Sequence, residues 1–171
     1  MNVMIHDLER DIFHSTFSFE SEDVQIISDE GSIKNCIGCF GCWIKTPGEC
    51  VLKDGYENMG RILSQADNVI VISRCCYGGY SPFVKNVFDR SISYLLPFFK
   101  IKRNETHHRQ RYQNTFRLSV YFYGEKISEQ EMETARNLIK ANSINFHVPE
   151  YAVSFFGSLS QLCEEVKMQW K

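Results

Sequence analysis

The sequence contains no long hydrophobic run and no excess charge of one sign. Among its 171 residues, no apolar stretch approaches the roughly 18 residues that a membrane-spanning helix needs. Residues 1–7 lack the cationic start and long apolar core of a signal peptide. Lys and Arg total 19 against 21 Asp and Glu, so no global basic field favours nucleic acid. We therefore expect a cytoplasmic protein that acts without a membrane or nucleic acid.

Proline is also scarce, at 4 residues, while hydrophobic residues make up 43% of the chain, which excludes a disordered or collagen-like chain. Cysteine is more abundant, with 7 residues. Their odd number, and the gathering of four of them within residues 36–50, argue against a disulfide framework. In a reducing compartment these residues serve as thiols, metal ligands or redox groups.

The fold is indicated by short apolar runs that alternate with amphipathic helical patterns. The runs occupy residues 3–5, 24–27, 69–72, 118–123 and 151–156. Such alternation is typical of an α/β fold with a parallel sheet. We predict one domain over residues 1–171, a flavodoxin-like three-layer sandwich with five parallel strands in the order 2-1-3-4-5. Residues 100–115 are polar and basic and are expected to form a loop or insertion.

Several helix starts carry a capping signal. Ser128 followed by Glu131, and Asp54 followed by Glu57, have the spacing of a capping box. Ser81 before Pro82 has the pattern of an N-cap with proline in the first turn. Asp7 is placed to cap a helix that follows the first strand.

The loop after the third strand has the most specific pattern. In a sheet of this kind, ligands bind beyond the carboxyl ends of the strands. The adjacent Gly78 and Gly79 would let the backbone approach a planar ligand closely, and Tyr77 offers a stacking face. An ordinary strand-to-helix turn capped by Ser81 accounts for the same residues equally well.

Motifs in residues 33–90 resemble those of the NADPH-dependent FMN reductase and iron–sulfur flavoprotein family. That family has a C-x-x-C-x-x-C loop after strand 2 and S-P-x-Y-[FWY]-G after strand 3. A Ser or Thr follows three residues after that Gly, and K-x-x-x-D-R comes later. The matching residues here are Cys36, Cys39, Cys42, Ser73, Tyr77, Gly78, Ser81, Lys85, Asp89 and Arg90. The resemblance implies that the second loop accepts the flavin of FMN. The residues that would contact it are Arg74, Cys75, Cys76, Tyr77, Gly78 and Gly79.

The chain departs from the family pattern at several positions. Arg74 replaces the family's proline, and Cys76 replaces its tyrosine. The family's glycine-containing phosphate loop after strand 1 is absent, and Asp7, Glu9 and Asp11 stand there instead. These carboxylates would stabilise a helix start and repel a phosphate. The basic residues Lys100, Lys102, Arg103, Arg109 and Arg111 offer either a substitute phosphate site, within one subunit or across a dimer, or a solvated loop.

Four cysteines are spaced so that they can converge on one site. Cys36, Cys39, Cys42 and Cys50 follow the pattern C-x2-C-x2-C-x7-C. This spacing allows a loop to wrap a [4Fe–4S] cluster, and four thiolates also suit zinc. Packing of free thiols is a third interpretation. The resemblance implies a cluster that passes electrons to FMN.

Taken with the resemblance, these patterns predict an NAD(P)H-dependent flavin oxidoreductase that passes electrons to a small acceptor. The family commonly forms dimers or tetramers, which implies the same here, with residues 94–99 as core and subunit interface. The alternative is a degenerate flavodoxin-like protein without flavin, acting as a binding or metal- or redox-sensing module. The carboxylates after strand 1 favour that alternative, and the loop after strand 3 favours the enzyme.

Overall fold

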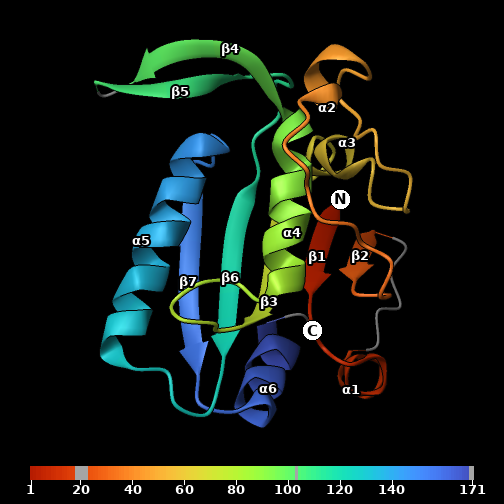
Figure 1. Cartoon of the computed structure of the whole chain (residues 1–171). Helices are drawn as coiled ribbons and strands as arrows, with labels where there is room; N and C mark the ends of the chain where they lie inside the picture. The colour runs from red at the N-terminus through yellow and green to blue at the C-terminus, as the bar shows by residue number, and fades with distance from the viewer. Residues whose placement is uncertain (18–22, 103, 170–171) are drawn as a thin grey trace.

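The protein is built around a five-stranded parallel sheet (Figure 1). The computed structural model describes residues 1–17, 23–102 and 104–169. The strands of the sheet are β1 (Asn2–His6), β2 (Val24–Ser28), β3 (Asn68–Arg74), β6 (Arg117–Tyr123) and β7 (Glu150–Phe156). Their order is β2-β1-β3-β6-β7, and every pair is parallel. The predicted order 2-1-3-4-5 is therefore confirmed, because β4 and β5 lie outside this sheet.

Helices cover both faces of the sheet and complete the predicted three layers. The helices are α1 (Arg10–Thr16), α2 (Gly41–Ile44), α3 (Met59–Leu63), α4 (Pro82–Arg90), α5 (Glu129–Asn145) and α6 (Leu159–Gln169), with a 3-10 turn at Ser91–Tyr94. One core packs α3, α4 and α5 against Val3, Val69 and Val71. The other packs α1 and α6 against Met4, Ile70 and Ile72. No helix within the described ranges is both long and apolar enough to cross a membrane.

Two of the predicted helix starts are confirmed. Ser128 and Glu131 form a complete capping box at the start of α5. The Ser81 hydroxyl accepts a hydrogen bond from the Val84 N–H at 3.5 Å, and Pro82 is the first residue of α4.

The other two predicted caps are wrong, because each carboxylate has a partner far away in the sequence. α3 begins only at Met59 without a side-chain cap, and Asp54 instead pairs with the guanidinium of Arg90. α1 begins at Arg10, after Glu9, also without a side-chain cap. The Asp7 carboxylate accepts the Arg74 N–H at 2.8 Å and the Tyr123 O–H at 3.2 Å.

The segment expected as a polar loop is mostly a β-hairpin. β4 (Leu95–Lys102) pairs antiparallel with β5 (Glu105–Gln110), and together they form a separate two-stranded sheet. Figure 1 shows this hairpin beyond the end of the main sheet where its strands begin, at the top, while the strand arrowheads point to the bottom. β4 and β5 thus form an insertion at the end of the sheet opposite to its carboxyl edge.

Gly60 provides a test of the packing between α3 and the 3-10 turn. A Cβ at this position would lie 2.2 Å from Ser93 Oγ and 2.6 Å from the Tyr94 backbone nitrogen. We expect Gly60→Ala to lower the free energy of unfolding by about 1–3 kcal/mol, because an overpacked backbone must shift. Urea denaturation measures this change. Gly157→Ala is the control, since its nearest atom is the Gln161 side-chain oxygen at 3.5 Å; equal stability of the two variants would contradict the prediction.

Candidate functional site

The loop after β3 is a tight turn at the carboxyl edge of the sheet. Cys76 and Gly79 exchange two backbone hydrogen bonds of 2.9 Å. Between them, Tyr77 and Gly78 both have positive φ, at 53° and 77°. Two such residues are typical of a type I′ turn, in which a non-glycine residue such as Tyr77 is strained. The turn presents the Tyr77 side chain to solvent at 94% exposure.

The turn is held in place from two sides. At its end, the Ser81 N–H donates to Ser73 Oγ at 2.8 Å. At its tip, a Cβ on Gly78 would lie 2.7 Å from the Thr134 Cβ and 2.9 Å from the Glu131 carbonyl oxygen. Glycine at residue 78 therefore lets the turn lie directly against α5. The six residues Arg74–Gly79 form one continuous segment, as expected, and their role in binding a cofactor stays a prediction.

A cavity of about 640 Å³ lies beside this turn. Its walls come from the ends of β3 and β6 and from the starts of α5 and α6. The lining residues are Arg74, Cys75, Tyr123, Gly124, Glu125, Lys126, Ile127, Glu131, Ser158 and Leu159. The segment after β6 was not singled out from the sequence. The sequence feature that indicates this segment is Gly124, which directly follows an apolar strand at the ligand-binding edge.

Asp7 lies where the carboxyl ends of β1, β3 and β6 meet. Burial raises the pKa of its carboxyl group, although hydrogen bonds from Ser81, Arg74 and Tyr123 oppose the effect. Burial, together with the charge of Asp7, also raises the pKa of Tyr123. Asp7 thus links three neighbouring strands through one partly desolvated carboxyl group.

The N–H groups of Asp7 and Leu8, in the turn after β1, are hydrogen-bonded to other groups of the chain. The Leu8 N–H donates to His6 Nδ1 at 3.2 Å, and the Asp7 N–H donates to the Ile72 carbonyl at 3.3 Å. Burial lowers the pKa of His6 to about 4, so its ring is neutral at physiological pH. The nearby Arg74 N–H is already bound to a carboxylate. These residues do not form the nest of free N–H groups that holds a phosphate.

The predicted basic residues lie in and directly after the hairpin. Arg111 Nε donates to the Ser93 carbonyl at 2.8 Å, and Arg109 Nε donates to the Phe99 carbonyl at 3.1 Å. The hairpin lies at the opposite end of the sheet from the loop after β3 (Figure 1). Within one subunit these residues are therefore remote from that loop, and their role in holding a phosphate stays a prediction. Arg103 lies outside the described residues.

The four predicted cysteines line a single second cavity of about 490 Å³. Cys36 and Cys39 are exposed, Cys42 is half-buried and Cys50 is buried. Burial raises the pKa of Cys42, and the nearby Cys50, Cys36 and Cys39 raise it further. The rest of the wall is mainly apolar, with Ile37, Phe40, Leu52, Phe88, Ile92, Leu95 and Phe146. Within the described ranges, no three His, Cys, Asp or Glu side chains converge on one metal ion.

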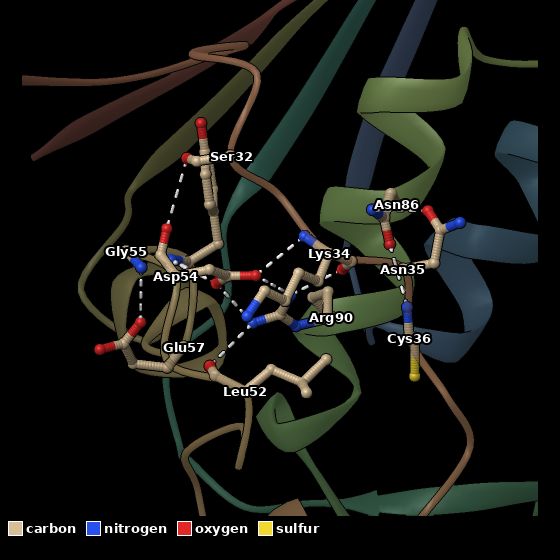
Figure 2. A network of polar contacts seen from close by, with 11 residues as sticks. Ser32, Lys34, Asn35, Cys36, Leu52, Asp54, Gly55, Glu57, Asn86 and Arg90 are labelled. Carbon is tan, nitrogen blue, oxygen red and sulfur yellow. Dashed lines mark hydrogen bonds and ion pairs between the residues drawn. The ribbon is translucent and has the colours of Figure 1, made fainter.

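Buried Arg90 fixes both ends of the cysteine loop (Figure 2). Its Nη1 donates to the Lys34 carbonyl at 2.7 Å and to Asp54 Oδ2 at 2.8 Å. Its Nη2 donates to the Leu52 carbonyl at 3.2 Å and to Asp54 Oδ1 at 2.9 Å. The side chain of Arg90 is 0% exposed and that of Asp54 is 2% exposed. The hydrogen bonds from Arg90 hold the pKa of Asp54 well below its usual range.

A second contact orients the first cysteine. The Cys36 N–H donates to Asn86 Oδ1 at 3.2 Å, and the Asn86 side-chain nitrogen donates to Asn35 Oδ1 at 3.1 Å (Figure 2). Arg90 was expected only as a motif residue, and neither Asp54 nor Asn86 was expected to hold the loop. The sequence signal for these contacts is weak, because the partners are 36 to 56 residues apart.

The two cavities lie at opposite ends of α4. Ser81, at its start, belongs to the loop after β3, whereas Phe88, Asp89 and Arg90 line the cysteine cavity. With nine residues, this helix is about 13 Å long. The chain therefore carries two candidate sites that do not share residues.

Comparison with known proteins agrees with the motifs. No family model matches the chain. A curated protein of Archaeoglobus fulgidus, an iron-sulfur flavoprotein, is 36% identical over 76 residues, which are 44% of this chain and 33% of the relative. The resemblance predicted from the sequence is confirmed. The chain spans about a third of the length of this relative.

Solved structures confirm the flavodoxin-like fold. An FMN-dependent NADH-azoreductase from Bacillus anthracis, in complex with FMN, has a TM-score of 0.52 and 11% identity, with 98% of this chain and 94% of that chain covered. An NAD(P)H:quinone oxidoreductase from Methanothermobacter marburgensis has a TM-score of 0.54 and 10% identity, with 99% and 90% covered. At these identities the likeness shows the fold alone.

The raised pKa of Asp7 predicts the pH dependence of stability. The native state keeps this proton at pH values where the unfolded chain has lost it, so Asp7 lowers the free energy of unfolding as pH rises above its ordinary pKa of 3.8. We expect Asp7→Asn to remove this contribution at pH values above the ordinary pKa of the carboxyl group. Urea denaturation at a series of pH values measures it. Asp11→Asn, on the exposed side of α1, is the control; a wild-type pH profile that Asp7→Asn leaves unchanged would contradict the prediction.

Proposed function

We propose that this protein is a flavin-dependent oxidoreductase that also carries a [4Fe–4S] cluster on Cys36, Cys39, Cys42 and Cys50. In this proposal NAD(P)H reduces the flavin, and the electrons pass to a small acceptor. The observation that carries the proposal is that four cysteines with the expected spacing line one cavity in a flavodoxin-like fold. The partial similarity to an iron-sulfur flavoprotein supports it.

We assign the cysteine cavity to a cluster rather than to a single zinc ion. Four thiolates around zinc meet at one point, about 2.3 Å from the ion. The four irons of a cubic cluster each take a separate thiolate, so its ligands stand farther apart. The thiols here share a cavity without converging on one ion. Much of the cavity wall is apolar, and the polarity around a bound cluster influences its reduction potential.

The loop after β3 fits the ring system of a flavin. When bound, a flavin accepts hydride and releases electrons one or two at a time. In this chain, the exposed Tyr77 would stack on a planar ring, and Gly78 with Gly79 would allow a close backbone approach. The Arg74 side chain, which lines the neighbouring cavity, would donate hydrogen bonds to ring carbonyl groups. Cys75, which lines the same cavity, and Cys76 would make the remaining contacts to the ring.

The phosphate of FMN does not fit the turn after β1. The Asp7 carboxylate already occupies the Arg74 N–H, and the N–H groups of Asp7 and Leu8 are bound within the chain. A second anion beside Asp7 would be repelled. We therefore propose that the chain recognises the flavin through its ring rather than through its phosphate.

The same arrangement also favours the alternative, in which the chain binds no flavin and acts as a metal- or redox-sensing module. The specific observation is again the occupied anion position at Asp7. The two functions differ in whether the loop after β3 binds a ring, so a flavin titration distinguishes them.

We further propose that the protein acts in the cytoplasm as a homodimer or homotetramer. All seven cysteines are free thiols, in keeping with a reducing compartment. In the segment expected as core and interface, Tyr94 and Leu95 are buried, whereas Phe98 and Phe99 on the hairpin are 63% and 58% exposed. Exposed aromatic side chains of this kind suit a subunit contact.

The cluster assignment predicts that anaerobically prepared protein is brown and contains iron and acid-labile sulfide in equal amounts. Cys39→Ser should bleach it, because one thiolate ligand is lost. Cys75→Ser is the matched control and should keep the colour, since Cys75 lies outside the cysteine cavity. Metal and sulfide analysis with absorbance spectra measures both. Protein that binds zinc alone, or no metal at all, would contradict the assignment.

The flavin assignment predicts that FMN binds at most about tenfold more tightly than riboflavin, a difference of about 1.4 kcal/mol. Absorbance titration with each flavin measures this difference in affinity.

Three variants test the residues involved. Gly78→Ala should weaken the binding of both flavins, because its Cβ would displace the turn from α5. Asp7→Ser should raise the preference for FMN, whereas Asp11→Ser, with the same change of charge, should not. A wild-type preference for FMN of several decades would contradict recognition through the ring, and no saturable binding of either flavin would favour the alternative.

A further inference from the structure

Arg90 has five N–H groups, and four of them are bound. An arginine side chain offers one N–H at Nε and two at each Nη. The four N–H groups on Nη1 and Nη2 of Arg90 match four acceptors, two on Asp54 and one each on Lys34 and Leu52. Its Nε is buried and has no hydrogen-bond partner among the described residues. A buried donor without a partner is destabilising, so an acceptor for the fifth N–H would be favourable.

The available acceptor is the sulfur of Cys50. Arg90 and Cys50 line the same cavity, and Cys50 is only 8% exposed. Leu52, whose carbonyl accepts from Arg90, is two residues beyond Cys50 in the sequence. The backbone of Cys50 is fixed as well, because its N–H donates to the Glu57 carbonyl at 2.9 Å. The Cys50 backbone and the Arg90 guanidinium are therefore both fixed at the wall of one cavity.

The chemical state of Cys50 decides how well its sulfur can accept this N–H. Among the described residues, Arg90 Nε makes no hydrogen bond of regular geometry, to the Cys50 thiol or to any other acceptor. A neutral thiol is a weak acceptor, whereas a metal-bound thiolate is a strong one.

We propose that Arg90 donates its Nε–H to the Cys50 sulfur when Cys50 is a ligand of the cluster. This inference rests on the cluster in the proposed function. Hydrogen bonds to the sulfur ligands are among the factors that set cluster reduction potentials. A donor stabilises the reduced cluster, which carries one more negative charge, so Arg90 raises the potential. Arg90 is then a positioning residue for the loop and an electrostatic partner of its fourth ligand.

The wild-type protein can test this contact without a substitution. The chain is produced with arginine labelled with ¹⁵N at Nε, and the cluster is reduced and studied by pulsed EPR. A hydrogen bond transfers some electron spin from the sulfur to its donor, so we expect a weak ¹⁵N coupling. Arg109→Lys, on the exposed face of the hairpin, should keep the coupling. A loaded and reduced cluster without any ¹⁵N coupling would overturn the contact.

A substitution tests the effect on the potential. Arg90→Lys keeps the positive charge beside Asp54 and removes Nε–H. We expect the ratio of reduced to oxidised cluster at a fixed potential to fall about tenfold, which is about 59 mV for one electron. A merely structural role would change the iron content and leave the potential of the remaining clusters as in the wild type, and that result would overturn the electrostatic role. If Arg90→Lys does not fold, the pulsed EPR measurement on labelled wild-type protein still tests whether Arg90 Nε contacts the Cys50 sulfur.

The outcomes separate this inference from the proposed function. An anaerobic wild-type protein without iron would overturn the cluster and the contact together. An iron-loaded protein without the ¹⁵N coupling would overturn the contact alone and leave the cluster in place.

Discussion

The buried ion pair between Arg90 and Asp54 determines where the cysteine loop lies. Removing two charges from water is costly, and such a pair is tolerated only when its geometry is good and its remaining hydrogen bonds are satisfied. Here the partners also bind the backbone of Lys34 and Leu52, at the two ends of the loop. The pair therefore fixes the position of a segment that has little secondary structure of its own.

The parallel sheet gives the protein two separate chemical regions. At its carboxyl edge, three strand ends meet at Asp7, and the loop after β3 turns beside them. At the other end, α4 delivers Arg90 and Phe88 to the cysteine cavity. The departure from the family pattern is confined to the first region, where a carboxylate stands in place of a phosphate-binding turn. The second region keeps its four thiols and the arginine that anchors them.

The sequence predicted the parts of the structure that depend on neighbouring residues. Strand order followed from the alternation of apolar runs and amphipathic segments, and Ser128 capped α5 through contacts three residues away. Asp7 and Asp54 show the limit of that reasoning. Both have the local pattern of a helix cap, but each carboxylate accepts hydrogen bonds from a residue at least 36 positions away in the sequence. The hairpin was missed for a related reason: the residues of its second strand, Glu105–Gln110, are all polar, and they form a strand by pairing with β4.

The attachment of the loop through protein groups alone affects what happens when a metal is lost. In small zinc domains, the metal supplies the free energy of folding, so removing it unfolds the chain. In this chain, Arg90, Asp54 and Asn86 bind the residues around the cysteines through protein groups. If the proposed cluster were lost, these contacts would keep the loop in place and leave an open set of thiols. Restoring the cluster would then require new iron and sulfide rather than a new chain.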